Sequence, residues 1–224
     1  MGENLNVRSV RFVTSAVQAS DYPDLAGMPE IAVAGRSNVG KSSLINGLVN
    51  RRQLARVSNT PGRTQLLNFF VVNEHFGLCD LPGYGFAAVP GKVKAGWGRM
   101  IETYLTSRTS LRALLLLIDV RREPGQWETD LVHWCSVQGH SVVPVVTKVD
   151  KLNRARRGLA VENIAKTLGF LPRKVIAWST LSGEGMEPLW QAVMRQVGPP
   201  PGSVEAELPS PAGPAPEGGP PSEP

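Results

Sequence analysis

Residues 35–42 contain glycines, a lysine and a serine at a spacing that suits phosphate binding. Gly35 and Gly40 let the backbone curl so that successive N–H groups point inward. Lys41 adds a full positive charge, and a serine directly after it can ligate Mg²⁺. An apolar run precedes this segment and helical apolar spacing follows it. This context predicts a phosphate-binding loop formed by Gly35, Arg36, Ser37, Asn38, Val39, Gly40, Lys41, Ser42 and Ser43.

A second motif, Thr147-Lys-Val-Asp150, follows a valine-rich run that is expected to be a central parallel strand. A carboxylate there can accept hydrogen bonds from the ring N–H and the exocyclic amine of guanine. Adenine offers no such pair of donors, so Asp150 would be left unpaired and ATP rejected. The alternative is a solvated Asp-Lys turn. It is disfavoured because the motif follows a phosphate-binding loop in the order that GTP-binding proteins require. We therefore expect guanine contacts from Thr147, Lys148, Val149 and Asp150, and from the backbone amides of Trp178, Ser179 and Thr180.

A third motif, Asp80-Leu-Pro-Gly83, ends another apolar strand. Asp80 is expected to hold a Mg²⁺-bound water, and the Gly83 N–H to contact the γ-phosphate. Thr64 is the candidate for a second direct Mg²⁺ ligand beside Ser42. The nucleotide-binding set is completed by Gly62, Arg63, Leu81 and Pro82, and the residues expected to act in hydrolysis are Lys41, Thr64, Gly83 and Asn38.

The elements that must position these motifs alternate between strand and helix. Two of the strands are too close in sequence for a helical crossover, so they are expected to form an antiparallel hairpin, and the others to run parallel. This predicts an α/β P-loop GTPase domain with a mixed six-stranded sheet, mostly parallel with one antiparallel strand, flanked by helices on both faces. Strands are expected near residues 30–34, 66–72, 75–80, 113–119, 141–147 and 174–178, and helices near 41–50, 91–109, 125–138, 155–168 and 185–197.

Composition favours one soluble domain in the cytoplasm. The 224 residues leave little room for a second domain beside this one. The longest apolar run, 113–118, is too short to cross a membrane, and polar residues interrupt the N-terminus where a signal peptide would need an apolar core. Cys79 and Cys135 are expected to be buried free thiols. We expect the domain to span 1–197, with a short extension, 1–29, packing on it.

Charge is distributed unevenly along the chain. Residues 198–224 hold ten prolines, four of the 19 acidic residues and no lysine or arginine, so this tail is expected to be disordered. The rest of the chain carries a formal charge of about +9, from 24 basic residues. Such a body suits a polyanionic partner, with nucleic acid the first candidate. Ordinary solubility charge is the alternative.

Several further stretches match a single protein family. Together with the three motifs, they resemble the EngB family of bacterial ribosome-biogenesis GTP-binding proteins over nearly all of residues 8–197. The resemblance implies a GTPase needed for assembly of the large ribosomal subunit, docking on ribosomal RNA, with cell division or septation affected downstream. We expect a monomer. The matching stretches are 35–46, 57–64, Asn68-Phe-Phe70, Asp80-Leu-Pro-Gly-Tyr-Gly85, Trp97, Tyr104-Leu105, Arg108, Leu117-Ile-Asp-Val-Arg121 and 147–152.

Two positions bear on the rate of hydrolysis. Tyr84 stands where Ras-type enzymes carry a water-orienting glutamine, so unaided hydrolysis is expected to be slow. Asn38 matches a position that, in related GTPases resembling this chain, helps hold a potassium ion beside the phosphates. A side chain that stabilises the loop by hydrogen bonding is the alternative for Asn38. The aromatic residues of 84–90 are open to two interpretations, as packing residues or as a partner-contacting surface.

Three functions are consistent with these observations. The first is a ribosome-assembly GTPase whose hydrolysis of GTP releases it from a precursor large subunit. The second is a GTP-gated RNA- or ribosome-binding module with negligible intrinsic hydrolysis. The third, service in RNA modification or at a membrane surface, is disfavoured because the chain has no room for a modifying domain and no lipidation signal.

Overall fold

The structure is a computed structural model that describes residues 7–50, 66–85 and 91–199. For 91–97 it describes the helical backbone alone. Three predicted site residues, Gly62, Arg63 and Thr64, lie outside the described residues. The aromatic segment beyond Gly85 and nearly all of the proline-rich tail lie outside them too.

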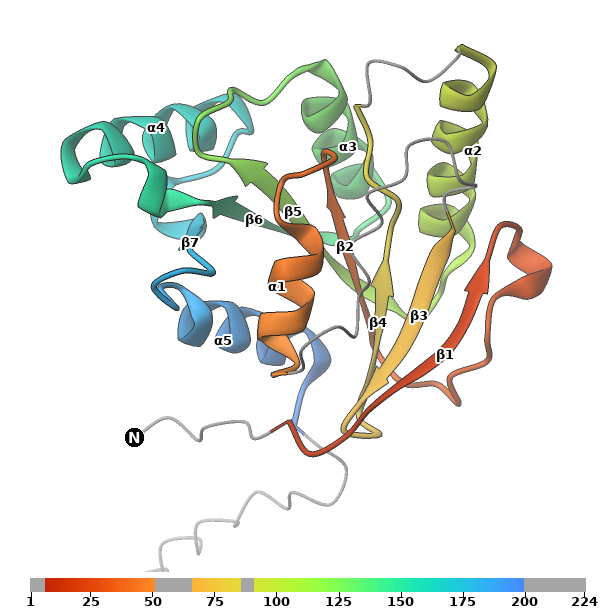
Figure 1. The fold of residues 1–224 in the computed structure, drawn as a ribbon. Helices are drawn as coiled ribbons and strands as arrows, with labels where there is room; N and C mark the ends of the chain where they lie inside the picture. The colour runs from red at the N-terminus through yellow and green to blue at the C-terminus, as the bar shows by residue number, and fades with distance from the viewer. Residues whose placement is uncertain (1–6, 51–65, 86–90, 200–224) are drawn as a thin grey trace, which may run out of the picture.

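In the described part of the chain, seven strands form one sheet in the order β1-β3-β4-β2-β5-β6-β7 (Figure 1). β2 pairs in parallel with β4 and β5, and the parallel pairing continues through β6 to β7. Among the described strands, only β3 is antiparallel to both of its neighbours, which confirms a mostly parallel sheet with one antiparallel strand. The strands are β1 (Val10–Ala16), β2 (Glu30–Gly35), β3 (Leu67–Val72), β4 (Phe76–Asp80), β5 (Leu111–Asp119), β6 (Ser141–Thr147) and β7 (Ile176–Trp178).

The predicted count of six strands is wrong because β1 was not foreseen. β1 extends the sheet at one edge by pairing with β3, from Val10 opposite Val72 to Ala16 opposite Leu67, with an irregularity after Phe12. Most of its side chains are exposed or half-buried, so its sequence carries no clear apolar alternation. A strand of this kind depends on its long-range partner more than on its own residues.

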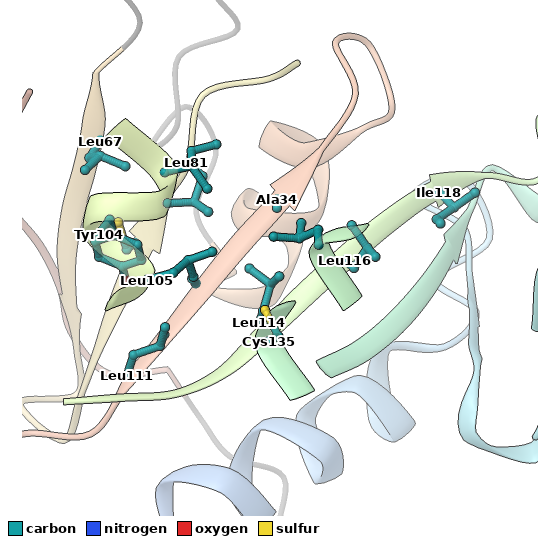
Figure 2. Close-up of a cluster of buried hydrophobic side chains, with 14 of the residues drawn as sticks. Ala34, Leu67, Leu81, Tyr104, Leu105, Leu111, Leu114, Leu116, Ile118 and Cys135 are labelled. Atoms are coloured by element: carbon teal, nitrogen blue, oxygen red, sulfur yellow. The ribbon is translucent and has the colours of Figure 1, made fainter. Parts of the chain in front are cut away.

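Five α-helices cover the two faces of the described sheet. α1 and α5 pack on one face, where Leu44, Ile45 and Leu189 are buried. α2, α3 and α4 pack on the other, where Tyr104 and Cys135 belong to a cluster of buried side chains (Figure 2). Within the described residues, none of these helices combines the length and apolarity that a membrane crossing requires. The helices are α1 (Lys41–Leu48), α2 (Gly91–Ser107), α3 (Gln126–Val137), α4 (Arg154–Thr167) and α5 (Met186–Val197), with short 3₁₀ turns η1 (Ala19–Asp21), η2 (Val149–Lys151) and η3 (Pro172–Lys174).

A buried carboxylate anchors the amino end of β2. Glu30 is fully buried and accepts hydrogen bonds from Arg108 Nη2 at 2.8 Å and Nε at 3.1 Å. The Tyr104 hydroxyl on α2 donates to the same carboxylate. A buried charge needs such partners, so this network holds the end of α2 against the start of β2.

The opposite, carboxyl end of the sheet is where ligands gather in folds of this kind. Because β2, β4, β5, β6 and β7 run in the same direction, their last residues lie along one edge. These residues are Gly35, Asp80, Asp119, Thr147 and Trp178. The three sequence motifs therefore meet at this edge, since each begins at, or directly after, the end of a strand.

Candidate functional site

The predicted phosphate loop connects β2 to the first turn of α1. A Cβ on Gly35 would lie 2.8 Å from Val39 Cγ1 and 3.0 Å from Leu117 Cβ, so a larger residue does not fit there. Gly40 caps α1 with φ +108°, a conformation that favours glycine. Lys41, Ser42 and Ser43 form the first turn of α1, where backbone N–H groups and the helix dipole favour an anion.

Lys41 of the phosphate loop contacts the carboxylate at the end of β4. Its ammonium forms an ion pair with Asp80, which is 8% exposed. The motif continues with Leu81, whose amide donates to the Val33 carbonyl oxygen at 3.0 Å, and with Pro82, which is buried. The structure thus brings together the two charged groups that were expected to face the phosphates and Mg²⁺.

Backbone contacts join the Asp80–Gly83 motif to the phosphate loop. The Ser37 amide donates to the Tyr84 carbonyl oxygen at 2.8 Å, and the Tyr84 amide donates to Gly35 O at 3.3 Å. The Ser37 hydroxyl donates to Gly83 O at 3.3 Å. A Cβ on Gly83 would lie 3.2 Å from Ser37 Oγ, so the close approach of the two loops favours glycine at this position.

The Tyr84 side chain packs against α3. Its ring centroid lies 3.7 Å from that of Trp127, and the residue is 5% exposed. Burial first, and the neighbouring Glu128 carboxylate second, raise the pKa of the Tyr84 hydroxyl far above its usual value. Sequence reasoning missed Trp127 and Glu128. The capping pattern is the one available signal, since Glu128 accepts a hydrogen bond from the Gly125 amide at 2.9 Å.

The guanine loop is hydrogen-bonded to the phosphate loop. The Thr147 hydroxyl donates to the Val39 carbonyl oxygen at 2.7 Å, and Thr147 is fully buried. The Lys148 ammonium donates to the carbonyl oxygen of Asn38. Both Asn38 and Lys148 have positive φ, +63° and +58°, an uncommon conformation that the contact between them helps to hold.

Asp119, at the end of β5, is a further site residue that sequence reasoning gave no role. Its carboxylate lies 3.0 Å from Lys148 Nζ and 2.7 Å from Arg121 Nη2. Burial raises the pKa of Asp119, but the hydrogen bonds from Arg121 and Lys148 outweigh burial and hold the pKa well below its usual range. Asp119, Lys148 and Asn38 line a cavity of about 140 Å³ beside the phosphate loop. The available signal was a carboxylate ending a buried strand, within the stretch 117–121.

Asp150 is held by a serine from the last predicted motif. The Ser179 hydroxyl donates to Asp150 Oδ1 at 2.6 Å, and this hydrogen bond is the main cause that lowers the pKa of Asp150. The Ser179 amide donates to the carbonyl oxygen of Glu184 at 3.1 Å, so it is not directed at a base. Trp178 is 1% exposed and its ring belongs to the core, whereas Thr180 is exposed. The sequence predicted backbone contacts here and missed the side-chain role of Ser179.

The oxygen donors of the site fit Mg²⁺ held jointly with a nucleotide. Among the described residues, no three His, Cys, Asp or Glu side chains gather where they could hold a metal ion. Ser42 and Asp80 nevertheless supply hard oxygen donors near the helix terminus. Mg²⁺ prefers such oxygens, takes few of them from protein and completes its shell with water and phosphate.

Comparisons with known proteins agree with this geometry. Residues 30–148 match the family model described as "50S ribosome-binding GTPase". The chain is 52% identical over 188 residues to the "probable GTP-binding protein EngB" of Syntrophotalea carbinolica, covering 84% of this chain and 90% of the relative. The corresponding protein of Geotalea daltonii is 49% identical over 189 residues, with the same coverage, 84% and 90%.

Solved structures show the same fold at lower identity. A crystal structure of a probable GTP-binding protein EngB has a TM-score of 0.63 at 22% identity, covering 75% of this chain and 98% of that one. Era of Aquifex aeolicus, bound to GDP and AlF₄⁻, has a TM-score of 0.58 at 21% identity, covering 77% and 57%. With motifs, geometry and relatives in agreement, the chain belongs to the EngB family of GTP-binding proteins and is a P-loop GTPase.

Proposed function

We propose that this protein is a GTP-hydrolysing switch required for assembly of the large ribosomal subunit, with cell division or septation affected downstream. The observation that carries the nucleotide-binding half is the buried hydrogen bond from Thr147 to Val39, which joins the phosphate loop to the guanine loop. The ribosomal half is supported by the description of the matching family and by the positive charge of the body. A basic surface suits ribosomal RNA. We further propose a cytoplasmic monomer.

In this proposal GTP or GDP occupies the phosphate loop and the guanine loop together. The Lys41 ammonium exchanges the Asp80 carboxylate for β- and γ-phosphate oxygens when nucleotide binds. Ser42 and Thr64 would hold Mg²⁺ directly and Asp80 would hold it through a water, and the ion would neutralise charge on the phosphates. Gly83 contributes its amide to the γ-phosphate, which the close approach of its loop to Ser37 supports.

We propose that intrinsic hydrolysis is slow because Tyr84, which directly follows Gly83, does not orient the attacking water. The Tyr84 ring is buried against Trp127, and its hydroxyl stays protonated at neutral pH. We therefore expect Tyr84→Phe to hydrolyse GTP within about twofold of the parent rate. A loss of 10²-fold or more, typical of removing a general base, would show that the hydroxyl acts in the reaction.

A potassium ion beside the phosphates is a second source of charge stabilisation in this proposal. The Asn38 side chain is exposed, and Lys148 contacts this residue through its backbone carbonyl oxygen, not through the side-chain amide. This favours a ligand role over the loop-stabilising alternative. Turnover is expected to be faster in potassium than in sodium at equal ionic strength. Equal rates of GTP turnover in potassium and in sodium would contradict a potassium site.

The experiment that tests the proposal measures GTP turnover in potassium buffer, with and without purified large ribosomal subunits. We expect the subunits to stimulate turnover, Asp80→Ala to abolish it, and Glu162→Ala, an exposed acid on α4, to leave it unchanged. If the subunits do not stimulate turnover but the protein still co-sediments with them in the presence of GTP, the alternative of a GTP-gated binding module with negligible hydrolysis would be favoured. Absence of both stimulation and co-sedimentation, also with assembly precursors, would contradict the ribosomal role.

A further inference from the structure

A groove lies between α5 and the strand β7 at the edge of the sheet, and none of the predicted nucleotide-binding residues that the structure describes lines it. Its volume is about 720 Å³. Apolar side chains from Val143, Phe170 and Ile176 line part of it, and side chains of α5 line one side. The groove reaches the last turn of α5, where Arg195 and Gln196 line it. It is thus partly apolar and open to solvent, as a binding site for an extended segment would be.

Three cationic side chains line this groove without acidic partners. Arg173 and Lys174 of η3 and Arg195 of α5 are exposed, and none of them forms an ion pair with the residues that the structure describes. Glu184 is the acidic residue in the lining, and its carboxylate pairs with Arg157. The groove therefore carries a net positive charge that suits an acidic ligand.

The sequence continues from the end of α5, which lines the groove, into an acidic segment. α5 ends at Val197, and the carbonyl oxygen of the next residue, Gly198, accepts a hydrogen bond from His75 Nε2 at 3.0 Å. Beyond this fixed point the sequence reads Pro-Pro-Pro-Gly-Ser-Val-Glu-Ala-Glu-Leu, from 199 to 208. Six residues lie between Gly198 and Glu205, and the seven residue steps that join the two positions reach about 24 Å when extended.

We propose that residues 204–208 of the tail dock in this groove, with Glu205 and Glu207 facing the cations of η3 and α5. Acidic and apolar residues alternate in Val204-Glu-Ala-Glu-Leu208, as a segment with one charged and one apolar face requires. The tether raises the local concentration of the segment to the millimolar range, so even a weak contact is populated. This proposal does not depend on the ribosomal role.

Paramagnetic broadening in the full-length protein tests the docking. Cys79 and Cys135 are both fully buried, so a spin label attaches at the new thiol of Ser210→Cys alone. At low salt we expect the amide signals of Arg173, Lys174 and Arg195 to broaden. Losing two exposed ion pairs in Glu205→Gln/Glu207→Gln lowers the docking constant about fivefold and reduces the broadening accordingly. Raising the salt to 1 M is expected to act likewise.

The matched control is Glu217→Gln/Glu223→Gln, which removes the same charge from the far part of the tail. It is expected to leave the broadening unchanged, and an equal effect of both pairs would contradict docking by 204–208. Reversing Arg173 and Lys174 to Glu is expected to abolish broadening, and Glu205→Lys/Glu207→Lys to restore it. Broadening on another face, or groove signals that shift with a short RNA and not with the tail variants, would overturn the proposal.

Discussion

Replacing Thr147 by valine tests whether the two nucleotide loops form one unit. Valine keeps the shape of the side chain but removes the hydroxyl that donates to Val39 O at 2.7 Å and to Ile118 O at 3.3 Å. Because Thr147 is fully buried, water cannot replace the lost bonds. A buried carbonyl left without its donor costs about 1–3 kcal/mol, so the free energy of unfolding is expected to fall by about 2 kcal/mol.

The same change is expected to weaken nucleotide binding, because the phosphate loop loses its link to the guanine loop. The loss cannot exceed the energy of the contact, so the Kd for GDP is expected to rise by between about threefold and thirtyfold. Urea denaturation gives the stability, and calorimetric titration gives the Kd. Thr147→Ser, which keeps the hydroxyl, is the control and is expected to bind GDP nearly as the parent does. Equal GDP affinity of Thr147→Val and Thr147→Ser would refute the reasoning, whatever their stabilities.

Three further predictions concern ionisable groups whose pKa is shifted in the folded protein. The pKa of Asp119 is lowered in the folded protein, so its ionised carboxylate stabilises the fold above its ordinary pKa near 4, and this stabilisation is lost as the pH falls below that value. Asp119→Asn should therefore flatten the acid side of a curve of stability against pH. An unchanged acid slope would argue against the ion pairs. Ser179→Ala removes the bond that lowers the pKa of Asp150, so loss of GDP binding on acidification should move to higher pH; an unmoved profile would contradict this role. Burial raises the pKa of Cys135 to about 12 and that of Cys79 well above its usual value, so iodoacetamide should modify neither in the native protein at pH 8 and both in urea.

The local motifs could be predicted from the sequence because the conformation of each depends on the residue types within the motif itself. Gly40 needs its positive φ, and Gly35 leaves no space for a side chain. The valine-rich run before Thr147 forms β6, which lies inside the sheet. Helices cover both faces of such a parallel strand, so its residues are apolar on both faces and the strand could be predicted. Strands and helices around these positions therefore lie close to where the sequence placed them, within about three residues.

What escaped prediction depends on contacts between distant parts of the chain. β1 is a strand because β3 lies beside it, and its own side chains are mostly exposed or half-buried. Asp119 reads as the end of an apolar run until the fold brings Lys148 to within 3.0 Å of it. Ser179 and Asp150 are 29 positions apart, so nothing local links them. The packing of Tyr84 against Trp127 likewise joins a loop to a helix that the sequence does not pair.

The most direct test of the central claim, that this site selects guanine through Asp150, is a titration of Asp150→Asn with GDP, XDP and ADP. Asparagine keeps an oxygen for the hydrogen bond from Ser179, so the loop is expected to stay in place. Asparagine replaces one accepting carboxylate oxygen with a donating NH₂ group. This group would face the guanine amine, which is also a donor, unfavourably, but it could donate to the carbonyl oxygen that xanthine carries at the same position. We expect the parent to bind GDP and reject ADP, and the variant to lose GDP affinity by about 10²-fold or more while gaining XDP. Unchanged GDP affinity in the variant, or equal binding of GDP and ADP by the parent, would contradict the account.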